Sequence, residues 1–147
     1  MLVKVGDSAN LQPLELACNN GDEGLFSNIR ASTRRGLPHV RPRKAVKQIA
    51  VICGGGASLA GSLESIRILK AAGAKVYALN ATAKFLTEHG IEPDAQIIVD
   101  SRAFNARFVE QRWAPELYLA SQCAPEVYAQ ALRVGYAVSI YHGSVDG

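Results

Sequence analysis

Five short apolar segments, each followed by a polar or glycine-rich cluster, form the main pattern of this chain. The segments and their clusters are QIAVIC before Gly54-Gly55-Gly56, KVYAL before Asn80, AQIIV before Asp100-Ser101-Arg102, ELYLA before Ser121-Gln122, and AVSIY before His142-Gly143. Such runs are typical of strands that are buried on both faces of a parallel sheet. Ligands of these sheets bind outside the carboxyl ends of the strands. We therefore expect the five clusters to share one edge, and this edge to carry the function.

Helical patterns separate the apolar segments. Leucine and isoleucine recur at helical spacing after the first segment, and Pro125 suits the first position of the last helix. Repeated strand–helix units predict an α/β fold, a three-layer α/β/α Rossmann-like sandwich with right-handed crossovers and five mainly parallel strands. We expect the strand order 3-2-1-4-5. Strand four would then lie beside strand one, and Ser121 and Gln122 would face the glycine turn across the switch point.

The chain divides into an N-terminal appendage, residues 1–47, and an α/β domain, residues 48–147. Asp22 is expected to cap a helix over about residues 23–35, with Leu25, Phe26 and Ile29 as its apolar contacts. The sequence stops six residues after Tyr141. A doubly wound sheet usually needs another helix over its last strand, so we expect the domain to be incomplete at its C-terminal edge. Either a second copy of the chain covers that side, or this is a shortened form of a longer domain.

Composition indicates a soluble domain. The 147 residues are 48% hydrophobic and 20% charged, and no apolar stretch approaches the roughly 20 residues of a membrane span. No secretory signal pattern opens the chain, so we expect no membrane partner. Three widely spaced cysteines without a C-x-x-C motif favour a cytoplasmic protein over a disulfide framework or a zinc site.

The net charge of +3 is concentrated in residues 30–47, which hold seven Lys or Arg residues and no acid. This basic stretch predicts an anionic partner, such as a phosphate, a nucleic acid or an acidic protein. A solvated helix end and linker is the alternative. No aromatic residue lies among these arginines, which disfavours binding of single-stranded nucleic acid.

The glycine turn, residues 54–58, joins the first strand to the following helix. Glycines let backbone amides approach a ligand closely, and a helix start favours phosphate or carboxylate, so Gly54, Gly55, Gly56, Ala57 and Ser58 are candidate binding residues. A tight turn without a ligand is the alternative. The common fingerprints do not fit, since Leu59 replaces the third glycine of G-x-G-x-x-G and Ser62 replaces the Walker A lysine. A dehydrogenase and a P-loop NTPase are therefore disfavoured.

The other strand ends supply further candidates. Asp100 would hold Mg²⁺ that bridges to phosphate oxygens, and Arg102 would clamp the same phosphates, which makes these two the candidate catalytic residues. A helix cap is the alternative role for Asp100. The further candidate binding residues are Asn80, Ser121, Gln122 and His142. Asn80 is expected to read a sugar or base, with capping of the next helix as its alternative role, and His142 to touch the ligand. A Cys123 nucleophile with His142 as its base lacks a visible orienting acid.

Three segments resemble the hydroxymethylpterin diphosphokinase-like family of Rossmann-like proteins. They are Val51 to Leu59, Ala78 to Leu86, and Gly90-Ile91-Glu92-Pro93-Asp94 running to Val99-Asp100. The resemblance implies a transferase that moves diphosphate from ATP to a pterin alcohol with Mg²⁺, or a relative in flagellin glycosylation that binds a nucleotide sugar. It also implies that Gly54 to Ser58 bind phosphate and that Asp100 lies in the metal or substrate site.

The chain departs from this family in two respects. Kinase-type members carry a second acid just after the strand-three aspartate, where this sequence has Ser101 and Arg102. Members also usually continue with a further glycine-rich segment, a strand and helices. We therefore expect a phosphate- or nucleotide-binding domain of a transferase. The alternative is a non-enzymatic assembly module that binds protein or nucleic acid.

Overall fold

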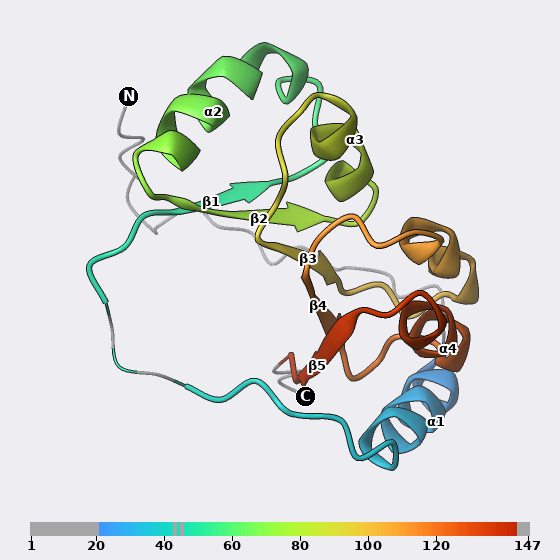
Figure 1. The fold of residues 1–147 in the computed structure, drawn as a ribbon. Coiled ribbons are helices and arrows are strands. Elements are labelled where there is room, and N and C mark those ends of the chain that lie inside the picture. The colour runs from blue at the N-terminus through green and yellow to red at the C-terminus, as the bar shows by residue number, and fades with distance from the viewer. Residues whose placement is uncertain (1–20, 43, 45, 144–147) are drawn as a thin grey trace, which may run out of the picture.

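The computed structural model describes residues 21–42, 44 and 46–143. Five parallel strands form one sheet, which confirms the predicted α/β class (Figure 1). The strands are β1 (Ala50–Cys53), β2 (Lys75–Leu79), β3 (Ala95–Ile98), β4 (Glu116–Ala120) and β5 (Ala137–Tyr141). The helices are α1 (Asp22–Thr33), η2 (Ala60–Ser62), α2 (Leu63–Ala71), α3 (Thr82–Glu88), η3 (Ala103–Val109) and α4 (Pro125–Arg133). None of these helices has the length and apolar character that a membrane span needs.

The predicted strand order 3-2-1-4-5 is wrong, because the strands follow one another as β1-β2-β3-β4-β5. Each connection therefore moves the chain one strand in the same direction. Right-handed crossovers that all move in one direction place their helices on the same face of the sheet. Helices cover both faces only when the direction reverses at a switch point, and the described sheet has no such reversal.

One face of the sheet is accordingly covered by all the crossover helices. Strand register aligns a row of buried residues across this face: Cys53, Ala78, Gln96, Leu117 and Val138. Helices α2 and α3 pack on the β1–β2 half of this face, and η3 and α4 pack on the β3–β5 half. The helices of Figure 1 accordingly gather on one side of the strands.

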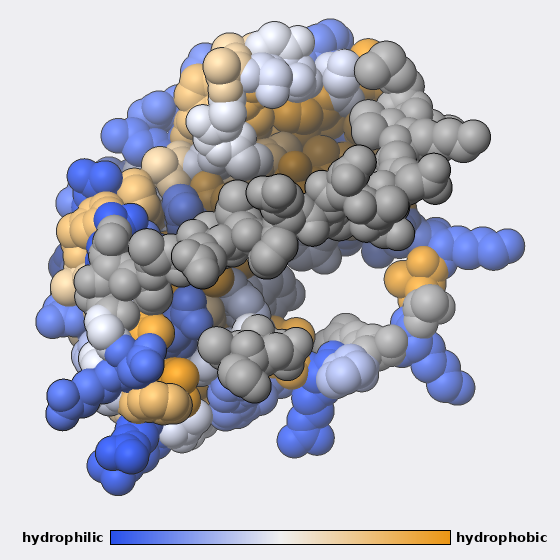
Figure 2. All heavy atoms as spheres, turned by 180° about the vertical axis from the view of Figure 1, so that it is seen from behind, coloured by the Kyte–Doolittle hydropathy of each residue, from blue (hydrophilic) through white to orange (hydrophobic). Residues whose placement is uncertain are grey.

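The opposite face carries no helix among the described residues, so the second helical layer of the expected sandwich is not seen there. Ile52 in β1 is 69% exposed, and Val99 after β3 is 51% exposed. Seen from behind, apolar side chains are visible in the upper half of the molecule, the half that holds β1 and β2 (Figure 2). The buried core therefore lies on one side of the sheet.

The segment after α1 joins the two edges of the sheet. Residues 38–40 lie parallel to β5, where Ile140 N donates to Pro38 O and Val40 N donates to Ile140 O, both at 2.8 Å. The chain then runs to β1 at the opposite edge (Figure 1). Part of the outer edge of β5 is thus occupied by this chain, and a second copy on that side stays a prediction.

An ion-pair cluster closes the amino end of the sheet. Asp94 accepts hydrogen bonds from Lys70 Nζ at 3.0 Å, Lys75 Nζ at 2.9 Å and the Val76 N–H at 2.9 Å. Burial alone would raise the pKa of Asp94, but these three donors outweigh it and lower the pKa to about 2. The cluster lies at the end of the strands opposite to the candidate site and serves stability.

Candidate functional site

Helix α1 lies over the carboxyl ends of β3 and β4. The Asn28 side-chain amide donates to the carbonyls of Ser101 at 3.2 Å and Gln122 at 3.0 Å. The Ser32 hydroxyl donates to the Ser121 carbonyl at 2.8 Å, and both serines are buried. Side chains of one helix thus satisfy backbone carbonyls that follow two neighbouring strands. The predicted ligand residues Ser121 and Gln122 lie where this helix contacts the sheet.

The C-terminal end of α1 is held in the same way. Arg35 donates to the Pro125 carbonyl at 3.3 Å, and its guanidinium lies 5.3 Å from the centre of the Tyr128 ring. The docking of α1 on the sheet was not predicted from the sequence. The sequence does carry one indication of it, because the polar residues Asn28, Ser32 and Arg35 recur at the spacing of one helix face.

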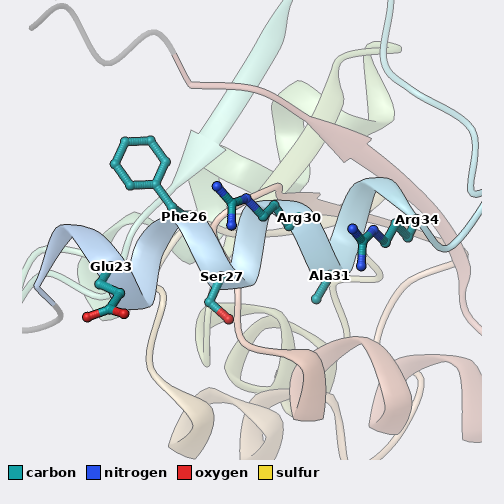
Figure 3. Close-up of a pocket in the computed structure, with 6 residues that line it drawn as sticks. All are labelled: Glu23, Phe26, Ser27, Arg30, Ala31 and Arg34. Carbon is teal, nitrogen blue, oxygen red and sulfur yellow. The ribbon is translucent and has the colours of Figure 1, made fainter.

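The outer side of α1 includes an aromatic side chain that we expected to be buried. Phe26, which we expected to be an apolar contact, is 61% exposed. It lines a pocket along this helix together with Glu23, Ser27, Arg30, Ala31 and Arg34 (Figure 3). Leu25 and Ile29 are half-buried, as an amphipathic helix requires.

Ser121 and Gln122 do not face the glycine turn across a switch point. They follow β4, and β2 and β3 lie between that strand and β1. Gln122 instead donates its side-chain amide to the Val99 carbonyl at 2.9 Å. The hydrogen bonds of α1 across to the strand ends therefore reach the ends of β3 and β4, and those of β1 and β2 receive none of them.

The glycine turn is exposed at the carboxyl end of β1, where residues 54–58 follow the buried Cys53. None of Gly54, Gly55 and Gly56 has a positive φ. A Cβ added at Gly56 would meet no described atom within 4 Å, and one at Gly55 would lie 3.7 Å from Thr82 Oγ1, an ordinary contact. Neither backbone conformation nor packing among the described residues explains the three glycines. Close approach of a ligand to the backbone remains as a physical reason for them.

The turn leads into its helix less directly than we expected. Leu59 N donates to Gly56 O at 3.0 Å, the 3₁₀ helix η2 follows, and α2 begins only at Leu63. Ser58 accepts a hydrogen bond from the Ser62 hydroxyl at its carbonyl, 2.9 Å, and makes no side-chain cap. The start of α2 is therefore separated from the glycines, and the backbone of the turn itself faces solvent.

Asn80 lies beside this turn, because β1 and β2 are neighbours. It has a φ of 50°, a left-handed conformation that asparagine tolerates better than most residues. Its backbone is held on both sides, since Asn80 N donates to Ile97 O at 3.0 Å and the Gln96 amide donates to Asn80 O at 2.8 Å. Its side-chain Oδ1 is buried and has no hydrogen-bond partner among the described residues.

Asp100 and Arg102 form an ion pair after β3. Arg102 Nε lies 2.9 Å from both carboxylate oxygens of Asp100, Nη2 contacts Oδ2, and the Arg102 N–H donates to Oδ1 at 2.9 Å. The side-chain hydrogen bond from Arg102 is the main reason that the pKa of Asp100 is lowered, and burial opposes it. Both oxygens of the expected magnesium ligand thus already accept from the arginine.

The residues around Asp100 offer few ligands for the expected Mg²⁺ ion. No cluster of three or more His, Cys, Asp and Glu residues suited to a metal occurs in the part of the chain that the structure describes. A metal held at Asp100 would have this one carboxylate and the oxygens of the bound ligand. Asp100 as a magnesium ligand therefore stays a prediction.

His142 and Cys123 are engaged elsewhere. His142 Nε2 lies 2.9 Å from His39 Nδ1 at the end of β5. Cys123 is fully buried, its Sγ contacts the Ile98 carbonyl at 3.4 Å, and burial raises the pKa of its thiol to about 12. A buried, protonated thiol is a poor nucleophile. The structure therefore gives no support to Cys123 as a nucleophile with His142 as its base.

A family model described as 6-hydroxymethylpterin diphosphokinase MptE-like matches residues 24–137 of the chain. No curated protein and no solved structure matches the chain. The family match begins within α1, at residue 24, and includes β1, β2 and β3 with the segments that follow them.

Proposed function

Because this chain belongs to the 6-hydroxymethylpterin diphosphokinase MptE-like family, we propose that it binds the phosphates of a nucleotide at the carboxyl ends of β1, β2 and β3. The observation that carries the proposal is the exposed run Gly54-Gly55-Gly56, whose missing side chains no described contact or dihedral explains. Successive backbone N–H groups without side chains form a surface that suits phosphate oxygens.

In this proposal, the ends of β1, β2 and β3 contact different parts of the nucleotide. The glycine turn contacts the phosphates, and Arg102 adds a positive charge from the end of β3. Asn80 lies between them on β2, and its amide reads a polar group of the sugar or base. Its left-handed backbone supports this role, because non-glycine residues held in this conformation by surrounding hydrogen bonds often occur at functional sites.

The reaction that the family suggests is diphosphate transfer from ATP to the alcohol of a pterin. A Mg²⁺ ion bound with the nucleotide would neutralise phosphate charge during such a transfer. This chain offers it one carboxylate, Asp100, so the ion would be held largely by the nucleotide phosphates. A nucleotide sugar presents the same diphosphate chemistry and is the alternative ligand.

Calorimetric titration of the full chain with ATP and MgCl₂ tests the proposal. Gly55→Val and Gly56→Val should each lower the affinity about tenfold or more, because the new side chains block approach to the backbone. Gly61→Val is the matched control, since Gly61 is also exposed and a Cβ there meets nothing within 4 Å. Absence of binding to ATP and to nucleotide sugars would contradict the proposal, and so would equal affinities in all three variants.

Asp100→Asn distinguishes two roles for the carboxylate. The ion pair favours a role in positioning Arg102, and the substitution should then change ATP affinity equally with MgCl₂ and with EDTA. An effect seen only with MgCl₂ would instead identify Asp100 as a metal ligand. Circular dichroism of the variant shows whether the fold is retained.

A second candidate function is assembly with an anionic partner. The outer side of α1 presents Phe26, Arg30 and Arg34 along one pocket, with Glu23 as the acid among its lining residues (Figure 3). A basic and aromatic surface suits an acidic protein segment. Salt-dependent association that is lost in Arg30→Glu, with ATP affinity unchanged, would favour this function.

A further inference from the structure

The Thr82 hydroxyl lies beside the glycine turn and has no hydrogen-bond partner among the described residues. Thr82 is the first residue of α3 and is 3% exposed. A Cβ added at Gly55 would lie 3.7 Å from Thr82 Oγ1, so the hydroxyl borders the space that a side chain at Gly55 would fill. The phosphate contacts of the glycine turn and of Arg102 do not involve this group.

A hydroxyl without a partner is unusual for a residue that is almost completely buried. Most buried polar side-chain atoms are hydrogen-bonded, and an exception calls for an explanation such as a bound ligand, ion or water. The other threonine of α3 follows the rule, since Thr87 Oγ1 donates to the Ala83 carbonyl at 2.9 Å. Thr82 begins the helix, so no preceding helical turn offers its hydroxyl a carbonyl. The hydroxyl is therefore free to donate to a group from outside the chain.

A ligand at the glycine turn can reach this hydroxyl. Two buried side-chain atoms of the described residues have neither solvent contact nor a hydrogen-bond partner, and they are Arg35 Nε and Asn80 Oδ1. Thr82 Oγ1 makes no hydrogen bond and is not one of them, so the small exposed part of Thr82 includes its hydroxyl. Asn80 is two residues away at the end of β2. Two unsatisfied polar side chains beside three glycines favour a polar ligand over a packing contact.

We propose that the Thr82 hydroxyl donates a hydrogen bond to the phosphate group that contacts the backbone of Gly55. The inference rests on the proposed nucleotide site and adds to it a binding residue that the sequence pattern did not indicate. A threonine hydroxyl can donate one hydrogen bond, and hydrogen bonds with an ionised partner are roughly twice as strong as those between neutral groups. The oxygens of one phosphate offer acceptors to this hydroxyl and to the N–H groups of the turn.

Calorimetric titration of full-chain variants with ATP and MgCl₂ tests this assignment. Thr82→Val keeps the branched shape and removes the hydroxyl, and it should weaken ATP binding roughly 10- to 100-fold, as expected for a hydrogen bond to a charged group. Thr82→Ser keeps the hydroxyl and should largely retain the affinity. Thr87→Val is the matched control, because it removes a hydroxyl of the same helix that bonds within the protein. Its ATP affinity should be unchanged.

Urea unfolding of the same variants separates ligand binding from a structural role. Because the Thr82 hydroxyl makes no hydrogen bond within the described chain, Thr82→Val should leave the urea midpoint unchanged or raise it. Thr87→Val should lower the midpoint, because it leaves the Ala83 carbonyl without this donor. A larger decrease for Thr82→Val than for Thr87→Val would assign the Thr82 hydroxyl to the fold and overturn the proposal.

The binding results distinguish this inference from the proposed function. If the native chain binds ATP and Gly55→Val weakens binding, but Thr82→Val binds as tightly as Thr87→Val, the role of the hydroxyl is wrong and the nucleotide site stands. If the native chain binds neither ATP nor a nucleotide sugar, both are wrong. A loss in Thr82→Val that is equally large in Thr82→Ser also contradicts the inference, because the hydroxyl would then not be the cause.

Discussion

Docking of α1 on the strand ends depends strongly on one buried hydroxyl. Ser32 is 1% exposed, and its Oγ lies 2.8 Å from the Ser121 carbonyl and 2.9 Å from the Ile29 carbonyl of its own helix. Ser32→Ala removes the donor that links the helix to β4 and changes little else in volume. We expect this substitution to destabilise the protein measurably.

The magnitude follows from two opposing effects. Leaving a buried carbonyl without its donor costs about 1–3 kcal/mol. Alanine in place of serine within a helix returns about 0.5 kcal/mol through its higher helix propensity. The net loss is therefore about 0.5–2.5 kcal/mol. With a urea m-value of roughly 1–3 kcal/mol per molar, the midpoint should fall by about 0.2–2.5 M, and by about 0.75 M for mid-range values of both quantities.

Equilibrium urea unfolding, followed by circular dichroism, measures this change. Thr33→Ala is the matched control, because the neighbouring Thr33 hydroxyl is exposed and bonds only to carbonyls of α1 at Ile29 and Arg30. Its midpoint should stay the same or rise slightly. Equal midpoints for Ser32→Ala and Thr33→Ala would refute the docking of α1 over the end of β4.

Three further predictions concern an ion pair, a buried amide and a buried thiol. The pKa of Asp94 is about 2 in the folded chain, which is lower than in the unfolded chain. Its ionised carboxylate therefore adds about 1–2 kcal/mol to the free energy of unfolding above pH 4, and this contribution is lost as the pH falls towards 2. Asp94→Asn should flatten this part of an acid-unfolding curve. Gln96→Leu should cost about 3 kcal/mol or more in urea unfolding, because the buried amide serves the carbonyls of Asn80 and Phe108. Cys123 should resist iodoacetamide at pH 7.5 in the native state and react after unfolding, as peptide mapping by mass spectrometry would show, since its pKa is raised to about 12.

Much of the secondary structure was predictable because its signals are local. Pro125 begins α4, a glycine at 135 precedes β5, and the predicted bounds of β2, β4 and β5 agree with the structure. The strand order was not predictable in this way, because periodicity describes one element at a time. One signal was overlooked: Glu116 and Tyr118 alternate with buried leucines in β4, a pattern of one-sided burial.

The candidate site was predictable only in part. The clusters after β1, β2 and β3 follow from the rule that parallel strands end at one edge, and the structure places them on neighbouring strands. The role of α1 did not follow, since its contacts reach backbone carbonyls over 70 residues away in the chain. Every residue has a backbone carbonyl, so the sequence does not identify the carbonyls that accept these hydrogen bonds. The polar face of α1 is the only part of this contact that the sequence indicates.

Hydrogen–deuterium exchange of the full chain with and without ATP and MgCl₂ probes a phosphate site at the glycine turn. We expect slower exchange in peptides that span residues 54–62 and 80–82, with peptides of β5 unchanged. Exchange that stays the same over the glycine turn at saturating ATP, or protection confined to α1, would contradict a phosphate site at the carboxyl end of β1.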